Sequence, residues 1–229
     1  MNFTITGTIA PLTKDKGIEN RINPTKTWVS NTYVFTVNSG TNHILVKVKA
    51  GERPNATTIS TLGVKNDGDE KYPNIEIPKD ARTDQANIDR VASFKKYKMY
   101  LAKPDDSDDV KKEYNVSYIY DLDFVKNVYV LVNKKSNVKF KLSGTVEYSY
   151  SDKTGTWYTD YVVNSIYRLA DPIEGKDEAP DYAKLVGEVD FCAEGSSKLK
   201  AEPAPEPGVR WGSAVFPNPV GKTQLAQLL

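Results

Sequence analysis

Two groups of side chains in this 229-residue sequence carry flat aromatic rings, and the first group also carries lysines. Aromatic rings stack on other flat groups, and ammonium groups attract anions. The sequence contains 14 tyrosines, whose polar tips suit a strand surface or a binding face better than a deep core. The first group is Lys26, Trp28, Tyr33, Phe35, Lys47 and Lys49, and the second is Tyr148, Tyr150, Trp157, Tyr158 and Tyr161.

Residues for most enzymatic chemistry are scarce. The chain has one histidine, His43, and one cysteine, Cys192, which excludes the ordinary zinc site and a Cys–His pair. A Ser-His-Asp triad would have to use His43. Asp121 and Asp123 form the only tempting pair of carboxylates, and without a neighbouring histidine or arginine they indicate a turn and the start of a helix. We therefore expect a non-enzymatic protein without catalytic residues, metal or cofactor.

Two further segments resemble ligand-binding motifs but lack residues that those motifs require. The acidic run from Pro104 to Asp109 lacks the glycine and the terminal glutamate of a calcium-binding loop. The tripeptide Gly221-Lys222-Thr223 resembles part of a phosphate-binding loop, but Phe216 stands where that motif needs glycine. We expect neither segment to bind a ligand.

Composition indicates a folded protein outside the membrane. Hydrophobic residues make up 39% of the chain and charged residues 27%, which is enough apolar material for a core. No apolar run approaches the roughly 18 residues that a membrane-spanning helix needs. The first residues lack the basic and apolar regions of a secretory signal, and a single cysteine cannot form an intramolecular disulfide. We expect no membrane partner and a location in a reducing cytosol.

The net charge of +1 is distributed unevenly. Residues 171–229 carry ten acidic and six basic side chains, so the first 170 residues have a net charge of +5. A basic body with an acidic rear segment is typical of proteins that hold a polyanion, although ordinary surface scatter gives the same asymmetry.

Alternating hydrophobic residues predict a mainly β protein. Residues 3–9, 28–37 and 44–49 alternate with period two and indicate a meander of three strands, with a polar loop at 13–27. Residues 138–150 and 157–169 indicate a hairpin, and Gly144 within it suggests a sharp bend.

Between these strands the pattern changes. We expect short strands at 58–62, 74–77 and 97–101 and a helix over 83–96. Residues 122–132 have the spacing of a second helix, with a buried strand at 128–132 as the alternative. One more strand is predicted at 183–191.

This order of elements predicts a five-stranded Greek-key barrel of the OB type. A long helix-containing insertion, residues 50–137, would connect the third and fourth strands, at little cost in loop-closure entropy. The barrel domain would span residues 1–194. Residues 195–229 are rich in proline and glutamate, and we expect a flexible linker and tail that is disordered or bound to a partner.

Four segments of the chain resemble phage-encoded OB-fold proteins that bind single-stranded DNA. They are residues 3–9, 80–101, 121–124 and 140–169. The second contains the run Val91-Ala92-Ser93-Phe94-Lys95-Lys96-Tyr97, and the fourth contains Gly144 and the tyrosine-rich hairpin. The resemblance covers about residues 1–191. It implies a sequence-tolerant single-stranded DNA-binding protein of phage replication or recombination in the host cytosol. Such proteins often end in an acidic tail with an aromatic tip, whereas this chain ends in Gln224 to Leu229, which puts recruitment of replication proteins by the tail in doubt.

On an OB barrel, the second and third strands and the neighbouring loops bind the nucleic acid. The resemblance therefore assigns base stacking to Trp28, Tyr33 and Phe35 and phosphate binding to Lys26, Lys47 and Lys49. Tyr148, Tyr150 and Trp157 would extend the stacking surface. Alternatively, Tyr33 and Phe35 belong to the buried face, and the hairpin tyrosines only form cross-strand pairs. The runs Lys95-Lys96-Lys98 and Lys134-Lys135-Lys139-Lys141 suit a phosphate path or simply a solvated face.

The alternative function is a structural or protein-interaction β-domain of a virion or of a host-interacting phage protein, in which the tyrosines anchor an interface. A nuclease is the weakest hypothesis. Oligomeric state and preference for DNA over RNA stay open.

Overall fold

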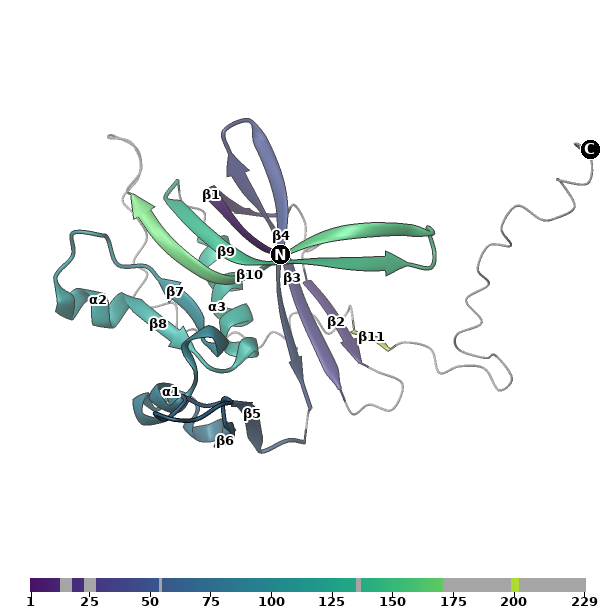
Figure 1. The fold of residues 1–229 in the computed structure, drawn as a ribbon. Helices are drawn as coiled ribbons and strands as arrows, with labels where there is room; N and C mark the ends of the chain where they lie inside the picture. Colours follow the sequence, from purple (N-terminus) through teal and green to yellow (C-terminus); the bar gives the residue numbers. More distant parts are fainter. Residues whose placement is uncertain (13–17, 23–27, 54, 135–136, 171–198, 202–229) are drawn as a thin grey trace, which may run out of the picture.

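The protein is mainly β, as the alternating pattern predicts. A computed structural model describes residues 1–12, 18–22, 28–53, 55–134, 137–170 and 199–201 (Figure 1). Five long strands pair in a closed ring, and the other described elements surround it. These five are β1 (Asn2–Pro11), β3 (Val29–Ser39), β4 (Asn42–Glu52), β9 (Lys139–Ser151) and β10 (Thr156–Ala170).

The ring closes through one parallel contact. β1 pairs antiparallel with both β3 and β9, β3 pairs with β4, and β9 pairs with β10. β10 then meets β4 in parallel, with Val162 opposite Lys47. Every strand of the ring therefore has a ring neighbour on both sides.

The interior of the ring is filled by one face of each strand. Along β3, buried residues alternate with half-buried ones, and β4 and β9 show the same period of two. Hydrophobic residues occupy the inward positions, which is why the sequence pattern was sufficient to place these strands. The inward side chains include Tyr33, Phe35, Val37, Val46, Val48, Phe140, Leu142, Val163 and Ile166.

The β9–β10 hairpin needs glycine at residue 144. A Cβ atom at Gly144 would lie 1.9 Å from the carbonyl oxygen of Val162, so no larger residue fits without moving the backbone. Gly144 pairs with Val163, next to a shift of register in β10. The outer half of this hairpin extends away from the other strands, toward the right in Figure 1.

Helix α3 (Asp121–Asn133) covers the ring and contributes much of the core. Its buried residues recur at helical spacing and include Phe124, Val128 and Val132. The helix prediction for 122–132 is therefore confirmed, and the alternative strand at 128–132 is wrong. The Asp121 carboxylate accepts a hydrogen bond of 3.0 Å from the Gly51 amide, which connects the start of α3 to the end of β4.

The connection between β4 and β9 carries several further elements besides α3. β5 and β6 form a separate hairpin, while β7 joins the large sheet between β10 and β8. The elements are β5 (Thr58–Leu62), β6 (Asn74–Pro78), η1 (Lys79–Ala81), α1 (Gln85–Arg90), η2 (Ser93–Lys95), β7 (Tyr97–Tyr100), α2 (Asp108–Tyr114) and β8 (Asn115–Tyr118). The strands predicted near 58–62, 74–77 and 97–101 are thus confirmed.

The helix predicted over 83–96 is wrong in its length. Only α1 and the single turn η2 form there, because the chain becomes extended at Val91. Val91 is fully buried in a small second core with Ile77 and Ile119, and this contact outweighs local helix propensity. The acidic loop predicted at 104–109 leads into α2, whose first turn is capped by the Ser107 hydroxyl.

Two short strands lie in segments expected to be irregular. β2 (Ile18–Ile22) occupies part of the predicted loop 13–27 and pairs antiparallel with β3. β11 (Leu199–Ala201), within the predicted tail, pairs in parallel with β2. The predicted strand at 183–191 and the rest of the tail lie outside the described residues. Among the helices that are described, none has the length and apolar character to cross a membrane.

Candidate nucleic-acid interface

Tyr33 and Phe35 lie in the core, so the assignment of base stacking to them is wrong. Their side chains are 3% and 0% exposed, and their rings pack 5.7 Å apart. Tyr33 also contacts Tyr129 of α3 edge to face, at 5.1 Å between ring centroids. Burial raises the pKa of the Tyr33 hydroxyl well above its usual range. The alternative, in which the Tyr33-Phe35-Val37 face of β3 is buried, is correct.

Trp28 stands at the entrance of β3 and is 42% exposed. One face of its ring lies against Gly51, where an added Cβ would come within 2.2 Å of the indole. The indole Nε1 donates a hydrogen bond of 3.1 Å to the Ser30 hydroxyl. This contact orients the ring, which lines a cavity of about 600 Å³. Lys26, predicted to act beside Trp28, lies outside the described residues.

Lys47 and Lys49 of β4 point outward from the ring, and both meet carboxylates. The Lys47 ammonium lies 2.5 Å from the Asp160 carboxylate, and the Lys49 ammonium lies 2.6 Å from Glu147 and 3.7 Å from Asp160. The two carboxylates come from β10 and β9, about a hundred positions away in the sequence, so no local pattern reveals these pairs. A phosphate at this face would have to compete with Glu147 and Asp160.

The outer half of the β9–β10 hairpin presents three aromatic rings on one face. Tyr150 is paired with Trp157 across the strands, at 5.3 Å between ring centroids, and Tyr148 is paired with Thr159. Tyr148, Tyr150 and Trp157 are between 48% and 68% exposed. Alternation places Tyr158 on the opposite face of the ribbon. The rings therefore form a cross-strand pair and still leave broad surfaces open to solvent.

A second cavity, of about 250 Å³, lies beside the outer face of the ring. One wall is formed by the run Phe94 to Tyr97, which leads from η2 into β7. The opposite wall belongs to β4, β9 and β10. Lys95 and Tyr97 line both cavities, so the two hollows are neighbours. The wall opposite Phe94–Tyr97 contains Lys49, Thr145, Glu147, Val162, Val163 and Asn164.

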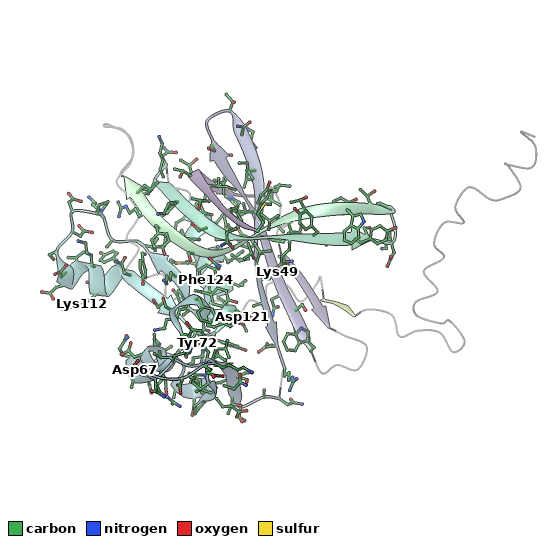
Figure 2. The ribbon with its side chains drawn as sticks, viewed as in Figure 1. Lys49, Asp67, Tyr72, Lys112, Asp121 and Phe124 are labelled. Carbon is green, nitrogen blue, oxygen red and sulfur yellow. The ribbon has the colours of Figure 1, made fainter. Side chains whose placement is uncertain are left out.

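Phe94 is the functional candidate that sequence reasoning missed. It lies within the segment predicted to be a helix, where it follows the apolar stripe and has no distinguishing spacing. The structure leaves it 59% exposed, in edge-to-face contact with Tyr72 at 4.9 Å. In Figure 2, Lys49 lies where the ring strands cross in the view, and Tyr72 lies toward the β5–β6 hairpin.

Two charged side chains that line the larger cavity, Glu52 and Lys79, pair with each other. The Tyr120 hydroxyl donates a hydrogen bond of 2.6 Å to Glu52, and the Lys79 ammonium lies 3.6 Å from the same carboxylate. Outside the cavity lining, Asp123 forms an ion pair of 2.6 Å with Arg82, a partner that is distant in sequence. These contacts indicate a structural role. Within the described residues no group of histidine, cysteine or acidic side chains could hold a metal ion.

Asp121 lies in the first turn of α3. Its carboxylate accepts hydrogen bonds from the amides of Gly51 and Leu122. Burial raises the pKa of this carboxyl, and the two amide donors partly oppose that rise. The interpretation of Asp121 as a helix start agrees with this geometry.

Comparisons with protein families, with curated proteins and with solved structures find no match to this chain. Inference about function therefore depends on the geometry described above.

Proposed function

We propose that the protein binds single-stranded DNA without strong sequence preference, through an OB-type barrel. The closed order β1–β3–β4–β10–β9, with α3 in the connection between β4 and β9, supports this assignment. In a barrel of this type, nucleic acid lies on the second and third strands and contacts the loop between the fourth and fifth. Those elements correspond to β3, β4 and the β9–β10 hairpin.

The observation that carries the proposal is the exposed aromatic face of the hairpin. Tyr148, Tyr150 and Trp157 lie on the strand ends that flank the loop corresponding to the binding loop of this type of barrel, and they are open to solvent. Each base stacked on such a ring contributes about 1–3 kcal/mol, whatever its identity. The lysines of β4 would attract the phosphates once their carboxylate partners are displaced. A role in phage replication or recombination, in the cytosol of the host, is part of the proposal.

A titration of fluorescently labelled oligo-dT, followed by anisotropy at two salt concentrations, tests the function. We expect a dissociation constant in the micromolar range or tighter at low salt. The affinity should fall steeply as salt rises, because each phosphate contact releases counterions. Absence of binding at low salt would contradict the proposal.

The second candidate is a protein-interaction domain, and one observation favours it. Both lysines of β4 are already paired with carboxylates, while the hairpin rings stand open as interface anchors would. This alternative predicts indifference to oligo-dT together with a stable assembly on size-exclusion chromatography.

A further inference from the structure

Phe94 and the two lysines after it form an unusual surface. Phe94 and Lys95 are exposed, Lys96 is half-buried, and the Lys95 ammonium lies 5.8 Å from the centroid of the Phe94 ring. In the described part of the chain, neither Lys95 nor Lys96 has a carboxylate within ion-pair distance. This distinguishes them from Lys47 and Lys49, whose charges are neutralised by Asp160 and Glu147.

The backbone on both sides of this surface is anchored. Before it, Val91 and Ala92 are buried, and the Ala92 amide donates a hydrogen bond of 2.9 Å to the Leu62 carbonyl. Within it, the Lys95 amide donates to the Ala92 carbonyl, also at 2.9 Å. After it, β7 pairs in parallel with β10 of the ring. An exposed ring on an anchored turn is held ready for a ligand, so little ordering entropy would be lost on binding.

The size and charge of the adjoining cleft indicate the kind of ligand. A volume of about 250 Å³ lies below the roughly 300–1,000 Å³ of pockets that enclose a small molecule, and suits one unit of a longer ligand. Among the described residues, its lining includes Lys49, Lys95 and Lys96 but one acidic residue, Glu147, so it favours an anion. A flat exposed ring beside ammonium groups that have no carboxylate partner in the described part of the chain matches a base attached to a phosphate.

We propose that one nucleotide unit of a bound DNA strand occupies the cleft between the Phe94–Lys96 segment and the outer face of the ring. The base stacks on Phe94, and Lys95 and Lys96 contact the flanking phosphates. The DNA strand would thus run from the aromatic side chains of the β9–β10 hairpin across the outer face of the closed β ring. It would then pass along the Phe94–Lys96 segment, which belongs to the connection between β4 and β9. The inference rests on the proposed function and adds a binding site to it.

The test compares variants of the full chain in the oligo-dT titration. Phe94→Ala should weaken binding by about 5- to 150-fold, the loss expected for one stacked base. Phe94→Leu, which keeps apolar volume without a ring, should lose nearly as much. Lys95→Gln/Lys96→Gln should lower the slope of log affinity against log salt by about 1.4, or about 0.7 for each lost phosphate contact.

The control is Lys111→Gln/Lys112→Gln on α2, which removes the same charge and should change the salt slope little; Figure 2 shows Lys112 well apart from Lys49 of the cleft. Ultraviolet crosslinking of oligo-dT should also label the peptide that contains Phe94. Circular dichroism should show each variant folded.

Two results would overturn the inference. If the wild-type protein binds oligo-dT but the Phe94 and Lys95/Lys96 variants behave like the Lys111/Lys112 control, the cleft is not part of the path while the function stands. If the wild-type protein does not bind at low salt, both the function and the cleft assignment fail.

Discussion

At the scale of single residues, the ion pairs on β4 make binding a competition between anions. Lys49 is held by Glu147 at 2.6 Å, and both side chains remain partly exposed. A pair at the surface contributes only about 0.2–1 kcal/mol, so a phosphate can displace the carboxylate at small cost. Glu147 would then lower the affinity without preventing binding.

Removing the Glu147 charge should therefore strengthen DNA binding. Glu147→Gln frees Lys49 from its nearest partner, and we expect an increase in oligo-dT affinity of about 2- to 5-fold. The salt dependence should steepen by up to about 0.7 in slope, because one more phosphate contact releases counterions. Glu113→Gln on α2 makes the same change of charge elsewhere and serves as the control. An unchanged affinity in Glu147→Gln would show that Lys49 does not contact phosphate.

The half-buried Asp121 should give a pH dependence of the opposite sign to that of an ordinary paired carboxylate. Burial raises the pKa of its carboxyl in the folded state above the usual value of 3.8. Between 3.8 and the raised pKa the folded state holds more protons than the unfolded state, so this group lowers stability as pH rises through that window.

Asp121→Asn removes the titration and keeps one acceptor. The free energy of unfolding of the wild type, minus that of Asp121→Asn, should fall as pH rises from 3.8 and then level off. Urea unfolding followed by circular dichroism across this range checks it. A difference that grows with pH would contradict the raised pKa.

At the scale of elements, the β9–β10 hairpin offers two faces that can be tested against each other. Trp157 and Tyr158 are adjacent and both exposed, but alternation directs them to opposite faces. Trp157 shares its face with Tyr148 and Tyr150. Tyr158 donates to or accepts from the Thr154 hydroxyl at 3.0 Å, near the turn.

Trp157→Ala should weaken oligo-dT binding by about 5- to 150-fold, through the loss of one stacked base. Tyr158→Ala, the matched control, should leave the affinity nearly unchanged. Neither should move the unfolding midpoint much, because both side chains are exposed. Equal losses of oligo-dT affinity in the two variants would mean that DNA does not bind to one face of the hairpin alone.

The sequence predicted the elements whose pattern is long and regular. Period two in β3 and helical spacing in α3 place hydrophobic residues on one face over ten or more positions, and tertiary contacts reinforce that local signal. It did not predict β2, α2 or β8, which are short and polar. These elements depend on pairing with β3 and β7 or on the Ser107 cap.

The candidate site was predictable only in part. Strand alternation predicts that Lys47 and Lys49 both point outward from the ring. It does not predict their partners Asp160 and Glu147, because closure of the ring brings those carboxylates to β4. Tyr33 and Phe35 could have been stackers or core residues, since alternation alone does not say which face is inside. The exposure of Phe94 could not be predicted, because it depends on the chain becoming extended at Val91 instead of continuing as a helix.

At the scale of the whole molecule, two cores of different size predict two levels of stability. The ring and α3 share a large core, which Ile59 of β5 also contacts, whereas the smaller core beside the β5–β6 hairpin consists of Ile77, Val91 and Ile119 with the half-buried Ile75 and Ile88. Segments with few buried apolar contacts open at a lower free energy than the global unfolding transition.

The rates of amide hydrogen exchange should therefore differ between the strands of the two cores. Amides of β5 and β6 should exchange faster than those of β3 and β4, by mass spectrometry of the intact chain. Ile77→Ala should speed exchange in β5 and β6 further while leaving β3 and β4 protected. Uniform protection across all four strands would show that the two cores open together.

The parallel contact between Val162 and Lys47 joins positions more than one hundred residues apart. During translation, β1, β3 and β4 leave the ribosome long before β10, the second partner of β4, has been made. The nascent chain thus carries a bare strand edge, which is a template for pairing with other chains. Yield in the cell should consequently depend on how quickly synthesis reaches β10, or on a chaperone that shields β4 until then.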